Sequence, residues 1–225
     1  MKFIDLQNIE YKEAWDLQVK LFHQILQEKS NTSENDELKN NKITEYLLFC
    51  EHPHVYTLGK SGEKNNLLIN NDFLKKINAT YFETDRGGDI TYHGYGQLVG
   101  YPILDLEKHN LRIRAYIEKM EDAIILTLAD YGIKSERLES ATGVWLDAGI
   151  EEKERKICAI GVKVSRFVTM HGFALNVNTD MSYFDYINPC GLSKGVTSMQ
   201  KELGYKLDFE EVKLKTKEHF FKFFS

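Results

Sequence analysis

A cysteine in a predicted turn and a lysine at the start of a strand-like run are the residues best suited to nucleophilic chemistry. Cys190 stands between a proline and a glycine, and such a turn can hold a side chain clear of regular backbone. A thiol attacks as the thiolate, and a neighbouring ammonium group lowers its pKa from about 8.5. Lys156, which opens the run KICAIG, could supply that ammonium. The competing interpretations are a small buried cysteine and a solvated lysine that follows the charged run 151–155.

A glycine-rich polar stretch, residues 86–97 (RGGDITYHGYGQ), is expected to face the same cleft. Its paired glycines are weak indicators of a phosphate cradle and also fit an ordinary tight turn. His93 and His171 each adjoin a glycine, where ligand contact competes evenly with packing. His52 and His54 flank a proline without a third ligand at metal-site spacing, so a turn with capping or stacking histidines is favoured over a metal.

Composition limits the class of protein. The chain has 225 residues, a formal charge of −5, 42% hydrophobic and 28% charged residues, which predicts one soluble globular domain over residues 1–225. The negative charge argues against binding dominated by nucleic-acid phosphates. No apolar run reaches membrane-spanning length, and the first residues do not resemble a secretory signal. Three cysteines cannot all pair internally, which favours a reducing cytoplasm.

The elements that must position these residues follow from hydrophobic periodicity. The clearest helix is predicted over 112–131, with an apolar stripe that includes Ile113, and Asp208 is predicted to cap a final helix. Pro102 indicates a strand at a sheet edge or a strand end. Strands cluster before and after the long helix, so an α+β fold is expected. Further helices are predicted at 10–29, 71–76 and 181–187, and strands at 2–6, 45–50, 55–59, 79–83, 98–104, 143–146, 156–165 and 167–177.

Five blocks taken in order resemble the octanoyl transferase family of lipoate biosynthesis. The resemblance covers about residues 15–204, and its blocks are EHPHVYTLG (51–59), RGGDITYH (86–93), KICAIG (156–161), HGFALN (171–176) and PCG (189–191). Two departures, His54 and Tyr95, occupy positions where the family has proline, and they bear on loop stiffness.

The resemblance implies a mixed β-sheet flanked by helices, as in the biotin/lipoate protein ligase-like fold. It implies transfer of an octanoyl or lipoyl group from acyl carrier protein to a lysine of a lipoyl domain, without a cofactor or a metal. The acceptors would be lipoyl domains of 2-oxoacid dehydrogenase complexes and the glycine cleavage H protein, with no nucleic-acid or membrane partner. Cys190 would be the acyl-thioester nucleophile and Lys156 the group that lowers its pKa. The acyl site would comprise Arg86, Gly87, Gly88, Asp89, Ile90, Thr91, Tyr92, His93, Ala159, Ile160, Gly161, Gly172, Phe173 and Ala174.

Three alternatives remain open on the residues alone. An ATP-dependent lipoate or biotin ligase of the same fold would activate the acid as an adenylate and would need no cysteine. A cysteine hydrolase would combine Cys190 with His93 or His171 and release free acid. A non-catalytic acyl-binding protein would bind the chain without transferring it.

Overall fold

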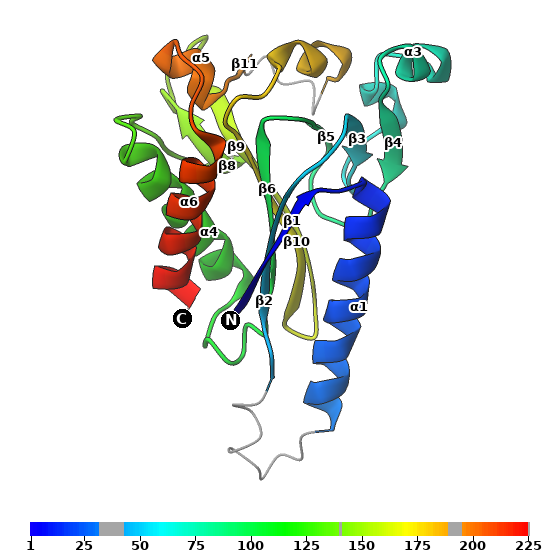
Figure 1. Cartoon of the computed structure of the whole chain (residues 1–225), viewed down its shortest axis with the longest axis vertical. Helices are drawn as coiled ribbons and strands as arrows, with labels where there is room; N and C mark the ends of the chain where they lie inside the picture. The colour runs from blue at the N-terminus through cyan, green and yellow to red at the C-terminus, as the bar shows by residue number, and fades with distance from the viewer. Residues whose placement is uncertain (32–42, 140, 189–194, 225) are drawn as a thin grey trace.

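A mixed β-sheet forms the centre of the protein (Figure 1). The computed structural model describes residues 1–31, 43–139, 141–188 and 195–224. Within those residues the larger sheet has eight strands, in the order β1-β2-β6-β10-β9-β8-β7, with β11 paired to β9. Its β1–β2 and β11–β9 pairs are parallel and the others antiparallel. The strands are β1 (Lys2–Asn8), β2 (Tyr46–Glu51), β6 (Gln97–Ile103), β7 (Glu136–Leu138), β8 (Ala141–Leu146), β9 (Arg155–Ser165), β10 (Val168–Asn176) and β11 (Gly195–Val196).

A smaller three-stranded sheet stands beside it and carries the glycine-rich stretch. Its order is β4 (Thr80–Glu83), β3 (Val55–Leu58) and β5 (Ile90–His93). The middle of this stretch is a strand, because its Ile-Thr-Tyr core consists of good strand formers that pair with β3. Three short helices, α3 (Asn71–Lys76), η1 (Lys64–Asn66) and η2 (Met181–Tyr186), lie near this sheet in the folded structure, and residues of α3 and η2 share its hydrophobic core.

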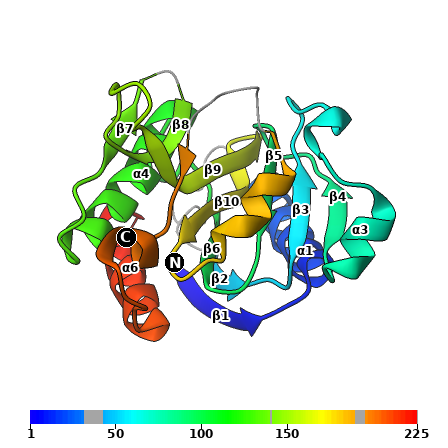
Figure 2. The same cartoon turned by 90° about the horizontal axis from the view of Figure 1, so that it is seen from above.

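Helices cover both faces of the larger sheet (Figures 1 and 2). Helix α1 (Tyr11–Ser30) packs on one face, and α4 (Ile113–Ala129) and α6 (Phe209–Phe224) pack on the other, while α5 (Met199–Leu203) precedes α6. In β2, Leu47 and Phe49 join the core under α4 and α6, whereas Leu48 and Cys50 join the core under α1. Burial on both faces explains why this strand is apolar throughout. Among the described residues, no helix combines the length and apolarity needed to cross a bilayer.

Two expectations about these elements need correction. Ile113 is 47% exposed, because it is the first residue of α4, and the buried face is formed by residues such as Met120 and Ile124. Of the two placements expected for Pro102, the sheet edge is wrong, because β6 is a central strand, and the strand end is confirmed, because Pro102 is one residue from the end of β6. It is tolerated near the end of β6 because the β10 ladder covers only Gln97 to Gly100, so its missing N–H interrupts no bond to β10. The predicted cap is confirmed, since Asp208 Oδ1 accepts from the backbone N–H of the third helical residue.

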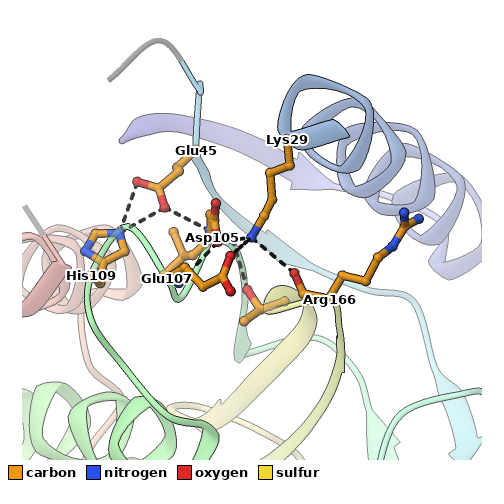
Figure 3. A network of polar contacts seen from close by, with 8 residues as sticks. Lys29, Glu45, Asp105, Glu107, His109 and Arg166 are labelled. Carbon is orange, nitrogen blue, oxygen red and sulfur yellow. Dashed lines mark hydrogen bonds and ion pairs between the residues drawn. The ribbon is translucent and has the colours of Figure 1, made fainter. Parts of the chain in front are cut away.

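A buried ionic network joins four segments at the β9–β10 turn (Figure 3). Lys29 Nζ, at the end of α1, contacts Asp105 Oδ1 at 2.5 Å and the carbonyl oxygen of Arg166 at 3.2 Å. Glu45, just before β2, accepts from His109 Nε2 at 2.9 Å and from the backbone N–H of Asp105 at 2.9 Å. Although burial opposes its ionisation, these hydrogen bonds hold the pKa of Glu45 below its usual value.

Candidate active site

A cavity of about 350 Å³ lies between the smaller sheet and strands β6, β8, β9 and β10. The glycine-rich stretch lines one side of the cavity, and the KICAIG and HGFALN blocks line the other. The predicted site residues that line it are Arg86, Gly88, Asp89, Ile90, Thr91, His93, Lys156, Ala159, Ile160, Gly161, Gly172, Phe173 and Ala174.

Two of the other predicted residues do not line the cavity, and a third is not described. Cys190 lies outside the described residues. Gly87 does not line the cavity; its N–H donates to the carbonyl oxygen of Val162 at 2.9 Å and ties the loop to β9. Tyr92 is fully buried behind the cavity, where its hydroxyl contacts His54 Nδ1 at 2.7 Å and its ring stacks on Tyr183. Gly87 and Tyr92 thus support the walls of the cavity and do not contribute lining surface.

The histidines near the turn at residue 53 stack and bond to neighbouring groups, as expected. His54 stacks on Tyr183 with ring centroids 4.2 Å apart. His52 Nδ1 donates to the carbonyl oxygen of Ile9 at 2.7 Å, and its Nε2 contacts the hydroxyl of Tyr101 at 2.7 Å. Tyr101 in turn lines the cavity.

Further lining residues were missed by the sequence analysis. Asn176 closes the HGFALN block, which was already recognised, so its polar amide was a usable signal. Tyr11 comes from α1 and Trp145 from β8, and no local pattern distinguishes either from a core aromatic. Gln97 and His171, which the sequence analysis had already considered for the cleft, also line it. The missed set comprises Tyr11, Val99, Tyr101, Ala141, Thr142, Trp145, Asn176, Phe184, Gly195 and Val196.

Lys156 places an ammonium group at the cavity. Its Nζ lies 4.7 Å from the centroid of the Trp145 ring, and the negative face of an indole favours the protonated amine. The Trp145 side chain is itself held by a hydrogen bond from Nε1 to the carbonyl oxygen of Ala141 at 3.0 Å. On the same strand, the N–H of Gly143 donates to the buried carboxylate of Glu121 at 2.9 Å, which fixes β8 against α4.

Arg86 brings a second, buried cation to the cavity. Its guanidinium donates from Nη2 to Thr57 O at 2.6 Å and to Thr57 Oγ1 at 2.9 Å, and from Nη1 to Gly87 O at 3.0 Å. Burial lowers the pKa of Arg86, yet a guanidinium stays charged at neutral pH. Its Nε is buried and has no hydrogen-bond partner in the described part of the chain. A fixed positive charge bonded mainly to neutral oxygens favours an electron-rich group in the cavity.

Two glycines allow the walls to approach closely. A methyl group at Gly161 would stand 2.8 Å from the carbonyl oxygen of Gly87 and 3.2 Å from Arg86 Cδ. One at Gly172 would stand 2.1 Å from the carbonyl oxygen of Gly100. These contacts explain why glycine is needed where the loop crosses β9 and where β10 meets β6.

His171 and Asp85 form a polar pair at another part of the wall. His171 adopts a left-handed backbone with φ 62°, and its Nε2 is 2.8 Å from Asp85 Oδ1. Burial lowers the pKa of His171, so the neutral ring donates Nε2–H to the carboxylate. The hydrogen bond from His171 and an ion pair with Lys163 at 2.5 Å hold the pKa of Asp85 below its usual value. His171 is therefore a poor proton acceptor at neutral pH.

His93 is also neutral. Burial lowers its pKa to about 3, and its Nδ1 is 2.8 Å from Gln97 Oε1. The two histidines that could have served a hydrolase are thus buried, uncharged and committed to hydrogen bonds. Among the residues that the structure describes, the cationic groups lining the cavity are Lys156 and Arg86, and such groups can polarise an acyl carbonyl and exchange a proton during acyl transfer.

Comparison with known proteins assigns the family. Residues 10–221 match the lipoyl protein ligase A/B catalytic domain. The chain belongs to the lipoyl protein ligase A/B family. An octanoyltransferase of Bacteroides fragilis is 54% identical over 210 residues, covering 93% of this chain and 91% of the relative. An octanoyltransferase of Christiangramia forsetii is 53% identical over 225 residues, covering 97% and 94%. This member of the lipoyl protein ligase A/B family is an acyltransferase.

The fold comparison agrees with the family. A lipoate-protein ligase A crystallised with ATP superimposes with a TM-score of 0.69 at 15% identity, covering 99% of this chain and 85% of the ligase. At that identity the similarity shows the fold alone. It confirms the expected fold of the lipoyl protein ligase A/B family, a mixed sheet flanked by helices.

Proposed function

We propose that this acyltransferase moves an octanoyl group from acyl carrier protein to a lysine of a lipoyl domain, through a thioester on Cys190. The names of the relatives that are 53–54% identical support the octanoyl group. The observation that carries the proposal is the ammonium group of Lys156 at the wall of a cavity whose other walls supply apolar surface. It is the group that the family resemblance pairs with Cys190.

The proposed reaction has two acyl-transfer steps, and Lys156 gives up a proton in the first and regains one in the second. The Cys190 thiolate attacks the thioester carbonyl, the carbon–sulfur bond to the carrier breaks, and Lys156 protonates the departing thiolate. The neutral amine of the acceptor lysine then attacks the acyl-enzyme and passes a proton to the Lys156 amine. The new amide forms as the Cys190 thiolate departs, and both groups return to their starting states. Exchange between thioesters is nearly isoenergetic and the amide is more stable, so no ATP is required.

The other two cysteines do not suit the role of nucleophile. Cys50 and Cys158 are both buried free thiols. Burial raises the pKa of each, and Cys158 belongs to the core under α4. Because the thiolate is the reactive form, neither can attack a thioester efficiently at neutral pH. Of the three cysteines in the chain, Cys190 is left for that step.

The experiment combines purified protein, octanoyl carrier protein and a lipoyl domain without ATP, followed by intact-mass analysis. Without the acceptor, we expect one octanoyl adduct that maps to Cys190; when the lipoyl domain is added, the adduct moves to its lysine. Cys190→Ser should abolish both, whereas Cys158→Ser, which changes only a core thiol, should retain both.

Each failure has a distinct meaning. Transfer that needs ATP would make the protein a ligase. Release of free octanoate without an acceptor would make it a hydrolase. Acyl binding that never leads to transfer would make it a binding protein. Transfer by an enzyme whose Cys190 stays unmodified would disprove the thioester.

A second experiment tests the pairing of Lys156 with Cys190. In Lys156→Ala, loss of the nearby positive charge should move the pH dependence of Cys190 alkylation upward. Lys153→Ala, in the exposed charged run before β9, serves as the matched control and should behave like the wild type. An identical alkylation profile in the Lys156 variant would remove the dyad from the mechanism.

A further inference from the structure

A series of side-chain hydrogen bonds runs through buried residues that line or support the cavity. It begins at Arg86, whose Nη2 is 2.9 Å from Thr57 Oγ1, and Thr57 Oγ1 is 3.4 Å from His93 Nε2. His93 Nδ1 is 2.8 Å from Gln97 Oε1. The chain continues from Gln97 Nε2 to Asn176 Oδ1 at 2.8 Å and ends with Asn176 Nδ2 on Thr197 O at 3.0 Å.

Backbone carbonyls determine the direction of every bond. Asn176 Nδ2 meets the carbonyl oxygen of Thr197, which can only accept, so Asn176 Oδ1 must face Gln97. Gln97 Nε2 also meets the carbonyl oxygen of Tyr92 at 3.1 Å, so Gln97 Oε1 must face His93. His93 therefore donates from Nδ1, and its unprotonated Nε2 can only accept.

The remaining link has the same direction. Thr57 Oγ1 already accepts from the Arg86 guanidinium, so its own hydrogen is available for His93 Nε2. In each of the five hydrogen bonds, the donor is thus the group nearer Arg86 and the acceptor is the group nearer Thr197. These side chains are buried, from Arg86 at 8% exposed to Thr57 at 0%, so water does not compete for the bonds.

The hydrogen-bond series ends at Thr197, next to Lys156. The N–H of Thr197 donates to the carbonyl oxygen of Lys156 at 3.0 Å, and Val196, one residue earlier, is paired with Lys156 in the sheet. Asn176 therefore holds the strand that flanks the lysine against β10. Through Gln97 and His93 it also links that strand to the loop that carries the buried guanidinium.

We propose that Gln97 and Asn176 are positioning residues of acyl transfer: they fix His93 as the Nδ1–H tautomer and hold β11 and Lys156 in register with the Arg86 wall. The inference rests on the proposed function only for its kinetic consequence, because the tautomer and the backbone register can be measured without any substrate.

Two isosteric variants interrupt the chain at different bonds. Asn176→Asp can still accept from Gln97 but places a carboxylate oxygen against the carbonyl of Thr197. Gln97→Glu can still accept from His93 but cannot donate to Asn176 or to Tyr92. The matched control is Asn178→Asp, two residues after Asn176 in the sequence. Asn178 Nδ2 likewise donates to a backbone carbonyl oxygen, that of Leu207, at 3.0 Å. Asn178 does not line the cavity.

The expected kinetic result is a fall in kcat/KM on the order of 100-fold for Asn176→Asp and Gln97→Glu, because a displacement of about 1 Å at reacting groups costs that much. Asn178→Asp should retain wild-type kcat/KM. Circular dichroism and thermal unfolding identify the folded variants. A folded Asn176→Asp enzyme as active as Asn178→Asp would overturn the proposal.

Two substrate-free measurements complete the test. In ¹⁵N-histidine NMR of the wild type, assigned with His93→Gln, His93 should carry its proton on Nδ1, and a proton on Nε2 would overturn the inference. Gln97→Glu still accepts from Nδ1–H but adds a negative charge, so it should favour the doubly protonated ring. Hydrogen exchange at the Thr197 amide should accelerate in Asn176→Asp and not in Asn178→Asp, and equal exchange would also overturn it. If the wild type transfers no octanoyl group, the proposed function fails while these two results still decide the positioning role.

Discussion

Lys156 Nζ lies 4.7 Å from the centroid of the Trp145 ring, so an indole face from β8 borders the only amine that lines the described part of the cavity. The two residues are register partners in neighbouring strands, and Trp145 is 2% exposed. A desolvated cation–π contact of this kind favours the ammonium form by about 0.5–2 kcal/mol.

Replacing the ring should therefore weaken Lys156 in its proton-transfer role. We expect Trp145→Leu to lower kcat about 2- to 30-fold, the range that corresponds to that energy, and Trp145→Phe, which keeps a π face, to lower it less. Without the indole the ammonium is lost at a lower pH, so the alkaline limb of the pH–rate profile should move to lower pH. Equal rates and equal limbs for the two variants would show that Trp145 contributes packing alone.

The guanidinium of Arg86 should not be replaceable by an amine. Lysine cannot reach Thr57 and Gly87 together, so Arg86→Lys should leave a buried acceptor unsatisfied and lower the free energy of unfolding by about 1–3 kcal/mol. Urea denaturation of the purified variant measures the change. Arg114→Lys, on the exposed face of α4, provides the same substitution without burial and should change stability by less than about 0.5 kcal/mol. A similar decrease in the free energy of unfolding for the two variants would contradict the structural role given to the buried Arg86 guanidinium.

The network at the β9–β10 turn predicts a pH-dependent stability (Figure 3). Hydrogen bonds in the folded state lower the pKa of Glu45 from its usual 4.5, so its stabilisation is complete above that pH and is lost as the pH falls through the folded-state pKa. Glu45→Gln should cost about 1–3 kcal/mol at pH 7, and the difference from wild type should shrink below pH 4.5.

The control for that experiment belongs to the same network. Glu107, whose side chain is 57% exposed, also pairs with Lys29, and an exposed pair contributes at most about 1 kcal/mol. Glu107→Gln should therefore have little effect at any pH. A Glu45 effect that stayed constant from pH 7 to pH 3 would mean that packing, not ionisation, explains it.

Close backbone contact predicts a large effect of one methyl group. Gly172→Ala would place a carbon 2.1 Å from the carbonyl oxygen of Gly100 and 2.7 Å from Pro102 Cδ, so β10 must shift. We expect a loss of about 1–3 kcal/mol in the free energy of unfolding. Gly87→Ala, whose added methyl would meet only Val162 O at 3.4 Å, should be much milder in the same thermal or urea unfolding assay.

Much of the fold could be predicted from local patterns. The apolar run of β2 indicated a buried strand, and the structure explains it through two cores that Leu47 and Leu48 enter from opposite faces. The cap at Asp208 was also predicted correctly, because it depends on groups a few residues apart. The stacking of His54 was expected from its place in a turn, but its partner, Tyr183, is distant in the sequence and was supplied by the tertiary structure. The expectation for Ile113 was wrong because hydrophobic periodicity does not show that the first residue of a helix is exposed. Periodicity also does not show which strands of a sheet are central, so it could not decide between the two placements expected for Pro102.

By itself, the sequence determined which chemistry was available: a lysine in the KICAIG block, a cysteine between a proline and a glycine, and glycines spaced through three blocks. Only the tertiary structure decided that Trp145 borders Lys156, that the helix residue Tyr11 reaches the cavity, and that Gln97 and Asn176 join its two walls. The physical reason is that these relations depend on strand register and on contacts between residues about 80 positions apart, for which local propensity carries no information.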